Sequence, residues 1–330
     1  MPVINRWIAS QANIPLVAQI IADHTIVADY DKIPAQYMTA IKKMFLSYPG
    51  ESHAFAIPAG LNALEALDED YAVNVTARGS EPEAYSESYL RFCASLRDMQ
   101  YGSWGEYCGE QGWYTWHAYD TPPVRWDTIE NHILVCHNND YEIAAIGFGW
   151  CWDMEGNGDG AGGTIDPVLG VRWAGASEGG PDGSHRWGLV SGDYALTGNR
   201  VCMDDYLAAT EDYIAYCIAE SIPTKVFFTT GPVDGNGTTE EGYQRFLKHE
   251  YIRNYVKANF SRILFDYADI LCYDDDGTPN TGSWSGHLFP IITTTNLGSA
   301  DIGHIGSTGR LRLAKALWWM LARMAGWDGN

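Results

Sequence analysis

The feature that most constrains the fold of this chain is an alternation of short apolar segments with longer segments of helical periodicity. Segments with the apolar character of buried strands lie at 44–48, 71–76, 142–150, 225–230 and 262–267. Segments with helical spacing or helix-start signals lie at 35–43, 58–67, 82–97, 126–137, 203–221, 242–259 and 310–325. This alternation predicts a central parallel sheet with helices on both faces, a three-layer α/β/α sandwich.

The sequence has no clear linker or internal repeat. A chain of 330 residues can hold one large domain or two small ones, and a hydrophobic content of 46% is ample for a core. We expect a single domain over 41–330, preceded by a lead-in at 1–40 without clear periodicity. We also expect long insertions, rich in Gly and Trp or irregular, at 99–126, 153–200 and 273–300.

Charge and hydropathy exclude several classes of partner. The 42 acidic and 21 basic residues give a net charge of −21, which argues against nucleic acid, because phosphate binding needs clustered Lys and Arg. The same charge disfavours anionic lipid, and the lack of an apolar run of about 18 residues predicts no membrane span. The first residues lack the pattern of a signal peptide. High negative charge is common in secreted proteins and favours an extracellular location.

The cysteines predict neither a disulfide framework nor a zinc site. There are seven, none in a C-x-x-C pair, and their odd number leaves at least one unpaired within the chain. We expect most of them to be buried thiols that act as small hydrophobic side chains.

Two short motifs, far apart in the chain, carry the chemistry. The first is Gly50-Glu51-Ser52 after the strand-like segment 44–48, and the second is Asp301-Ile302-Gly303-His304 before the last helical segment. Open α/β sheets gather functional groups at the carboxyl ends of their strands, so Ser52 and His304 are expected to meet there. A serine hydroxyl needs a base to take its proton and the base needs an orienting acid, roles for which Ser52, His304 and Asp301 are the candidates.

With these motifs placed, the chain resembles the SGNH (GDSL-like) hydrolase superfamily over roughly residues 40–327. The first family block resembles Gly50–Ser52, with Glu51 in place of Asp, and the last block matches Asp301–His304. Gly79 has the placement of the family's second-block glycine. The resemblance implies a flavodoxin-like fold with Ser52 as nucleophile, His304 as base and Asp301 as the residue that orients it.

The third family block is missing. The family has an Asn after its third strand, which donates to the oxyanion, whereas this chain has Gly147-Phe148-Gly149-Trp150-Cys151-Trp152-Asp153. The segment Gly231-Pro232-Val233-Asp234 carries the glycine and aspartate, but has Val at the Asn position and follows the fourth strand. We expect backbone N–H groups of Ser52 and Gly79 to form the oxyanion hole, with an indole donor from Trp150 or Trp152.

Each candidate also has a structural explanation. Ser52 can cap the helix that follows it, Asp301 can cap the last helix, and His304 can be a structural histidine with local hydrogen bonds. His53 is expected to point away from the direction in which Ser52 attacks. It is a candidate for a supporting role beside the nucleophile or, like Asp153, for substrate contact.

Two acidic loops resemble calcium loops only in part. An EF-hand loop beginning at Asp153 would need Glu at its twelfth position, which is Thr164. The run Asp274-Asp275-Asp276-Gly277 is better explained as a solvated turn. We therefore expect no metal.

The sequence favours a serine ester hydrolase that acts through an acyl-enzyme and needs no cofactor. The 13 Trp and 20 Tyr residues suggest an acylated carbohydrate or an aromatic ester as substrate. The alternative is a non-catalytic binding or assembly protein that has the fold but not the oxyanion Asn. A metal-dependent hydrolase that uses the acidic loops is a third reading.

Overall fold

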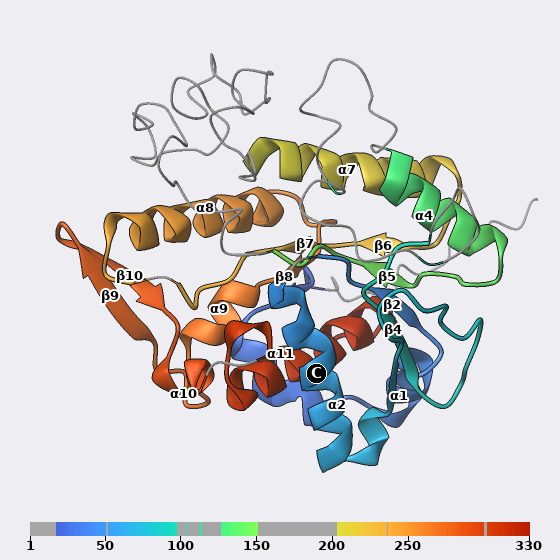
Figure 1. Ribbon diagram of the computed structural model, residues 1–330, viewed down its shortest axis with the longest axis horizontal. Helices are drawn as coiled ribbons and strands as arrows, with labels where there is room; N and C mark the ends of the chain where they lie inside the picture. The colour runs from blue at the N-terminus through green and yellow to red at the C-terminus, as the bar shows by residue number, and fades with distance from the viewer. Residues whose placement is uncertain are drawn as a thin grey trace, which may run out of the picture.

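The computed structural model describes residues 18–50, 52–97, 104, 113, 127–150, 203–235, 237–299 and 302–330. Within this part the chain forms a mixed α/β fold around a parallel sheet (Figure 1). The strands of the sheet are β1 (Ile21–Ala22), β2 (Phe45–Ser47), β3 (Val73–Val75), β4 (Leu90–Cys93), β5 (Ala145–Ile146), β6 (Lys225–Val226), β7 (Phe228–Thr229) and β8 (Leu264–Phe265).

The sheet runs without a break through β6 and β7. Five strands pair in the order β3-β4-β2-β5-β6, and three more in the order β1-β8-β7, with every pairing parallel. Only Phe227 separates β6 from β7, so one strand changes its partner from β5 to β8 along its length. The carboxyl ends of all these strands therefore lie at one edge of the sheet.

The strand order places a reversal point beside β2. When the outer strands β1 and β3 are left out, the order across the sheet is β4, β2, β5, the continuous strand β6 and β7, and then β8. Numbered by their position along the chain, these strands are the second, first, third, fourth and fifth. This is the doubly wound, flavodoxin-like order, and ligands of such sheets bind at the carboxyl edge where the order reverses. Here the order reverses between β2 and β5, and Ser52 follows the carboxyl end of β2.

Helices cover both faces of the sheet, as a parallel sheet requires. In Figure 1, α4, α7 and α8 lie above the sheet, and α1, α2 and α11 lie below it. The helices are α1 (Ala35–Ile41), α2 (Ala56–Leu67), α4 (Asp127–Asn138), α7 (Met203–Ala219), α8 (Glu240–Lys257), α9 (Tyr267–Cys272), α10 (Thr294–Leu297) and α11 (Ser307–Met324). Shorter 3-10 segments are η1 (His24–Lys32), η2 (Ser52–Phe55), η3 (Glu69–Tyr71) and η5 (Ile302–His304).

Two hydrophobic clusters, one on each face of the sheet, hold the layers together. The first joins α2, α9 and α11 to the sheet, and its centre includes Leu61, Leu317 and Trp318, all fully buried. The second joins α4, α7 and α8 to the other face through Ile133, Tyr213 and similar side chains. Fully burying a large apolar side chain stabilises the fold by about 1.5–3 kcal/mol, so these clusters supply most of the driving force.

The described cysteines fit the expectation of buried thiols. Cys93, Cys136, Cys217 and Cys272 are free and buried, and burial raises the pKa of each thiol. A raised pKa keeps these groups as neutral thiols at ordinary pH.

The prediction of a helix over 82–97 was wrong. That segment contains β4, which lies between β2 and β3, and Arg91 of β4 is only 2% exposed. Its guanidinium donates to the carbonyl groups of Glu83, Ala84 and Lys43 and so fixes the loop before the strand. A four-residue strand anchored by a buried arginine has no periodicity that distinguishes it from a helical turn.

Two other expectations also differ from the structure. The predicted irregular stretch 273–300 contains an antiparallel hairpin, β9 (Asn280–Trp284) and β10 (His287–Ile291), followed by α10. The predicted lead-in 1–40 contributes β1 and η1 to the domain, because β1 pairs with β8. Both elements are short and depend on tertiary contacts, which a local pattern does not contain.

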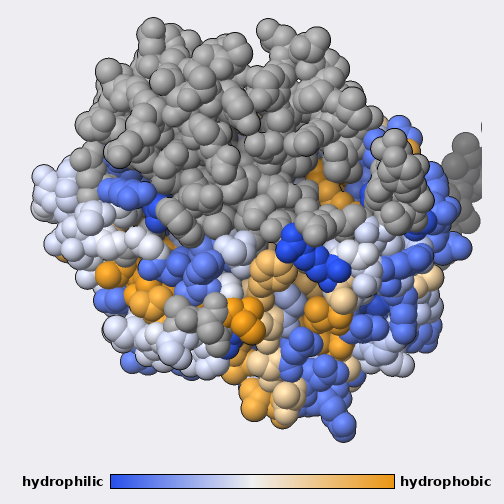
Figure 2. All heavy atoms as spheres, in the orientation of Figure 1, coloured by the Kyte–Doolittle hydropathy of each residue, from blue (hydrophilic) through white to orange (hydrophobic). Residues whose placement is uncertain are grey.

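The surface of the described part is mixed in polarity. On the face in Figure 2, hydrophilic residues dominate the flanks and apolar residues reach the surface mainly over α2. Leu67, at the end of α2, is 71% exposed. Scattered exposed apolar side chains are normal for globular proteins and indicate no docking surface by themselves. Among the described helices, none combines the length and apolar content needed to cross a bilayer.

Candidate active site

Ser52 and His304 meet at the carboxyl edge of the sheet, although 252 residues separate them in the chain. His304 Nε2 lies 2.9 Å from Ser52 Oγ, at an exposed position. This distance is within the range in which an imidazole accepts a proton from a hydroxyl. The pair therefore has the geometry of a nucleophile and its base.

Close backbone packing at the reversal point places Ser52. The strand β2 continues to Gly50, which forms a parallel bridge with Gly149 at the end of β5. A Cβ atom on Gly50 would lie 2.2 Å from the Gly149 carbonyl oxygen, and one on Gly149 would lie 2.4 Å from Ala54 Cβ. Two glycines are thus required for the chain to turn here and begin η2 at Ser52.

An unusual backbone conformation places His304. Gly303 and His304 are both left-handed, with φ of 67° and 60°. A Cβ atom on Gly303 would lie 2.6 Å from the backbone nitrogen of Ala56, so only glycine lets η5 approach the start of α2 so closely. Left-handed non-glycine residues are uncommon and cluster at functional sites, which fits a role for His304 beyond packing.

A second histidine lies beside the first. His53 is 1% exposed, its Nε2 lies 2.8 Å from Asp234 Oδ1, and its ring centroid lies 4.6 Å from that of His304. Because a carboxylate only accepts, Nε2 of His53 carries the hydrogen. Of the two roles expected for His53, this burial does not fit substrate contact and is compatible with support of the His304 ring.

Asp234 was not assigned to the site from the sequence. It follows β7, at the same edge of the sheet as Ser52, and lies 181 residues from His53. Its position after a strand was visible in the sequence, in the segment Gly231–Asp234. Its contact with His53 could not be predicted, because the resemblance to the hydrolase family implies no pair of this kind.

Two of the expected oxyanion donors are used elsewhere. The Gly79 N–H donates to Ser95 Oγ at 2.7 Å, and the Trp150 Nε1–H donates to the Thr229 carbonyl oxygen at 3.1 Å within the core. Gly79 also follows the outer strand β3, which β4 separates from β2. We therefore correct both assignments, since each N–H is already used in another hydrogen bond. Asp301, Trp152 and Asp153 lie outside the described residues.

A second serine–histidine pair is buried, and its histidine cannot act as a base for the serine. Ser47 Oγ lies 3.0 Å from His132 Nε2, while the Arg97 N–H donates to His132 Nδ1 at 3.1 Å. Nδ1 is therefore the acceptor and Nε2 carries the hydrogen, so His132 cannot take a proton from Ser47. Burial also lowers the pKa of His132 to about 3. This pair is structural.

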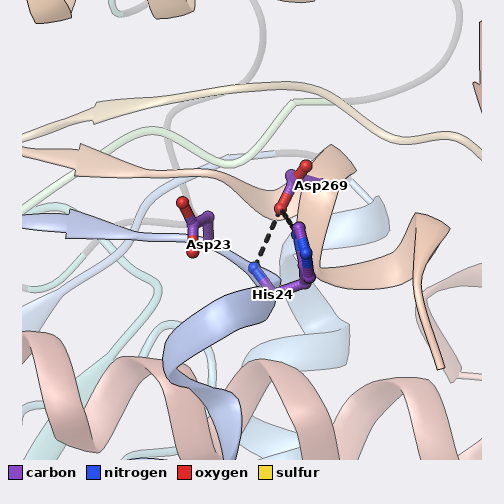
Figure 3. Close-up of side chains that lie close together, drawn as sticks. All are labelled: Asp23, His24 and Asp269. Carbon is purple, nitrogen blue, oxygen red and sulfur yellow. Dashed lines mark hydrogen bonds and ion pairs between the residues drawn. The ribbon is translucent and has the colours of Figure 1, made fainter. Parts of the chain in front are cut away.

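A third group of polar side chains lies at the β1 end of the same edge. Potential ligand atoms of Asp23, His24 and Asp269 lie within 4.8 Å of one another (Figure 3). Asp269 Oδ2 accepts from the backbone N–H of His24 at 2.8 Å and also contacts its Nδ1, while Asp23 Oδ1 accepts from Thr25. The contacts of His24 with Asp269 join η1 to α9, and Asp23 caps the start of η1, so the group has a structural explanation.

Comparisons with protein-family models, with curated proteins and with solved structures returned no match to this chain. Its function is therefore inferred from the geometry of the Ser52 site.

Proposed function

We propose that this chain is a serine ester hydrolase of the SGNH type, with Ser52 as nucleophile and His304 as base. The observation that supports it is the 2.9 Å contact between His304 Nε2 and Ser52 Oγ at an exposed position. Its place at the reversal point of the sheet adds to that support, because such sheets bind ligands there.

In the proposed reaction, Ser52 Oγ attacks the carbonyl carbon of an ester while His304 Nε2 takes the hydroxyl proton. The tetrahedral intermediate then collapses, the C–O bond of the ester breaks, and His304 returns the proton to the leaving alcohol. Water attacks the acyl-enzyme with His304 again as base, which releases the acid and restores Ser52. No cofactor takes part in this scheme.

The pair of buried His53 and partly buried Asp234 orients the base in this proposal. The His53 ring packs against His304 and is itself held by the Asp234 carboxylate. A fixed neighbouring ring restricts the rotation of His304, whose base function depends on its orientation. Asp301 remains our proposal for the direct partner of His304.

Backbone amides at the start of η2 are the proposed oxyanion donors. Ser52 begins η2, and the backbone N–H groups of a helical first turn point out of the start of the helix. They also lie at the positive end of the helix dipole, which favours a developing negative charge. These amides replace Gly79 and Trp150 in the scheme.

Covalent labelling of Ser52 tests the proposal. The purified chain is treated with a fluorophosphonate, and the adduct is located by mass spectrometry. We expect the label on Ser52, no label in Ser52→Ala, and a fall in kcat/KM for p-nitrophenyl acetate of about 10³-fold or more, since loss of a nucleophile costs at least that much. The matched control is Ser47→Ala, which removes the buried serine and should be labelled like the parent. Equal turnover by parent and Ser52→Ala would exclude this mechanism.

A non-catalytic binding protein is the second candidate. The observation that favours it is the use of Gly79 and Trp150, two donors expected for the oxyanion hole, in other hydrogen bonds. Loss of one oxyanion donor alone costs about 10²–10³ in kcat. This candidate predicts no fluorophosphonate adduct on Ser52.

A further inference from the structure

An exposed apolar side chain, Ile302, lies two positions before the proposed base. It is 51% exposed and begins the segment η5, which ends at His304. Gly303, between the two, is buried against Ala56, whereas Ile302 and His304 are both exposed. Because consecutive Cα atoms are about 3.8 Å apart, the Cα atoms of Ile302 and His304 are separated by no more than about 7.6 Å. Apolar surface is thus available to solvent directly beside the base.

The chemistry of the proposed reaction determines which part of an ester lies on this side of Ser52. His304 Nε2 returns a proton to the oxygen of the leaving alcohol, and this transfer requires hydrogen-bond distance between the two atoms. The alcohol part of the ester therefore lies beside His304 when the C–O bond breaks. A chain that continues from that oxygen over η5 meets Ile302, so Ile302 is placed to contact the alcohol part of the substrate.

A hollow on the other side of the pair, at the edge of the sheet, does not offer a comparable contact. His53, Gly149 and Trp150 are among the residues that line it, and it has no space for a molecule of the size of water. It therefore cannot take up an alkyl or aryl group. Of these two features beside the Ser52–His304 pair, Ile302 is the one that can contact an apolar group of the substrate.

We propose that Ile302 selects esters of apolar alcohols, such as alkyl or aryl alcohols, over esters of sugars and other polyols. The inference rests on the proposed hydrolase function and adds to it the class of the leaving group. An apolar group that covers Ile302 removes apolar surface from water, which is favourable in proportion to the area covered. A polyol would instead place hydroxyl groups against the methyl groups of Ile302, where they find no hydrogen-bond partner. Isoleucine is stiff at χ1, so its ordering on contact costs little entropy.

A matched pair of acetates tests this inference. Heptyl acetate and 2-(2-methoxyethoxy)ethyl acetate have alcohol chains of equal length, but ether oxygens replace two methylene groups in the second. The measurement is the ratio of kcat/KM for the heptyl ester to kcat/KM for the ether ester. Comparison of this ratio between parent and variant cancels the different intrinsic reactivity of the two esters.

Ile302→Ser should lower this ratio about fivefold or more. A single methylene group in a closed hydrophobic pocket changes kcat/KM by about 10–200-fold, and a contact on an open surface contributes less than that. Ile302→Leu keeps an apolar side chain of the same volume and should keep the parental ratio.

Two controls locate the effect. Leu67→Ser makes the same kind of change at an apolar position that is 71% exposed, at the far end of α2 and roughly 16 Å along the helix from Ala56, and should keep the parental ratio. The second control varies the acyl chain in ethyl acetate, ethyl butyrate and ethyl hexanoate. The dependence of kcat/KM on acyl length should be the same in Ile302→Ser and in the parent, because Ile302 lies on the alcohol side.

Three results would overturn the inference. They are an unchanged ratio in Ile302→Ser, an equal fall of the ratio in Leu67→Ser, and a change in Ile302→Ser that is confined to the acyl series. All three leave the hydrolase proposal intact, since esters are still hydrolysed and Ser52 is still labelled by the fluorophosphonate. A parent that is not labelled at Ser52 would instead overturn the hydrolase proposal and this inference with it, so the two failures are distinguishable.

Discussion

At the scale of single residues, the described part of the chain contains two serine–histidine contacts of nearly equal length, one that we propose to be catalytic and one that is structural. Ser52 with His304 is exposed, whereas Ser47 with His132 is buried and its histidine already accepts from Arg97. Distance alone does not separate a catalytic pair from a structural one. The deciding observation is which ring nitrogen remains able to accept a proton.

Asp234 provides a test of the proposed support for His304. Asp234→Asn removes the charge that holds His53 but keeps the shape of the side chain. We expect kcat to fall by up to about 10²-fold, since a misplacement of about 1 Å away from the reacting atoms can cost that much. KM should change little, because neither residue contacts the substrate in our scheme.

The measurement is kcat and KM for p-nitrophenyl acetate, together with the rate of fluorophosphonate labelling of Ser52. Asp70→Asn, an exposed aspartate in η3, is the control and should match the parent in both. If Asp234→Asn keeps the parental labelling rate, the pair has only a packing role.

The sequence allowed the Ser52–His304 pair to be predicted, but not the pair beside it. The motifs at Gly50–Ser52 and Asp301–His304 carry their own signal, because each has a recognisable spacing and place relative to a strand or helix. The contact between His53 and Asp234 has no such signal, since it depends on how two strand ends are positioned in space. Gly79 was misassigned because the short strand β4, which separates β3 from β2, was read as part of a helix.

At the scale of elements, the approach of η5 to α2 depends on one glycine. Gly303 is left-handed, and a Cβ atom there would overlap Ala56. A left-handed alanine costs about 1–2 kcal/mol relative to glycine. We expect Gly303→Ala to destabilise the fold by more than this, because the overlap of its Cβ atom with Ala56 must also be relieved. Displacing η5 should separate His304 from Ser52 and lower kcat/KM by at least tenfold.

Gly286→Ala is the matched control for that prediction. Gly286 is also left-handed, with φ of 84°, but a Cβ atom there meets nothing within 4 Å. Thermal denaturation and ester turnover of both variants separate backbone strain from overlap. Equal effects of the two substitutions on stability and turnover would show that the contact with Ala56 does not matter.

The short elements were the ones that sequence patterns could not locate. The longer helices α2, α7, α8 and α11 were predicted within a few residues, since each spans three or more turns and carries helical signals along its length. The strands β1 and β4 were missed, because two to four residues do not establish a period. The hairpin of β9 and β10 was missed because only the middle residue of each strand is buried, so that no apolar alternation marks it.

At the scale of the whole molecule, the contact of His24 with Asp269 should make stability depend on pH. Burial lowers the pKa of His24, and the positive charge of Arg312 also lowers it. The hydrogen bond to Asp269 and the negative charges of Asp269 and Asp23 raise it by more, so the net effect is a raised pKa. A raised folded-state pKa stabilises the fold fully below the unfolded value of about 6.5. That stabilisation is lost as the pH rises through the folded-state pKa.

His24→Phe tests this linkage while it keeps a ring to stack on Tyr273. We expect the difference in Tm between parent and variant to be larger at pH 5.5 than at pH 8.5. Comparing the two proteins at each pH cancels the contribution of other titrating groups. A difference that is constant across this range would show that the contact carries no linked proton.

The pairing of β1 with β8 has a consequence for how this protein folds while it is being synthesised. Ile21 pairs with Leu264, which the ribosome adds 243 residues later. At a synthesis rate of about 5–20 residues per second, the first strand waits roughly 10–50 s for its neighbour. Throughout that time β1 exposes an unpaired edge to the cellular environment, and His304 has not yet emerged to meet Ser52. A nascent chain therefore becomes competent for chemistry only after His304 has been synthesised, 252 residues after Ser52, and the unpaired β1 segment is available to chaperones in the meantime.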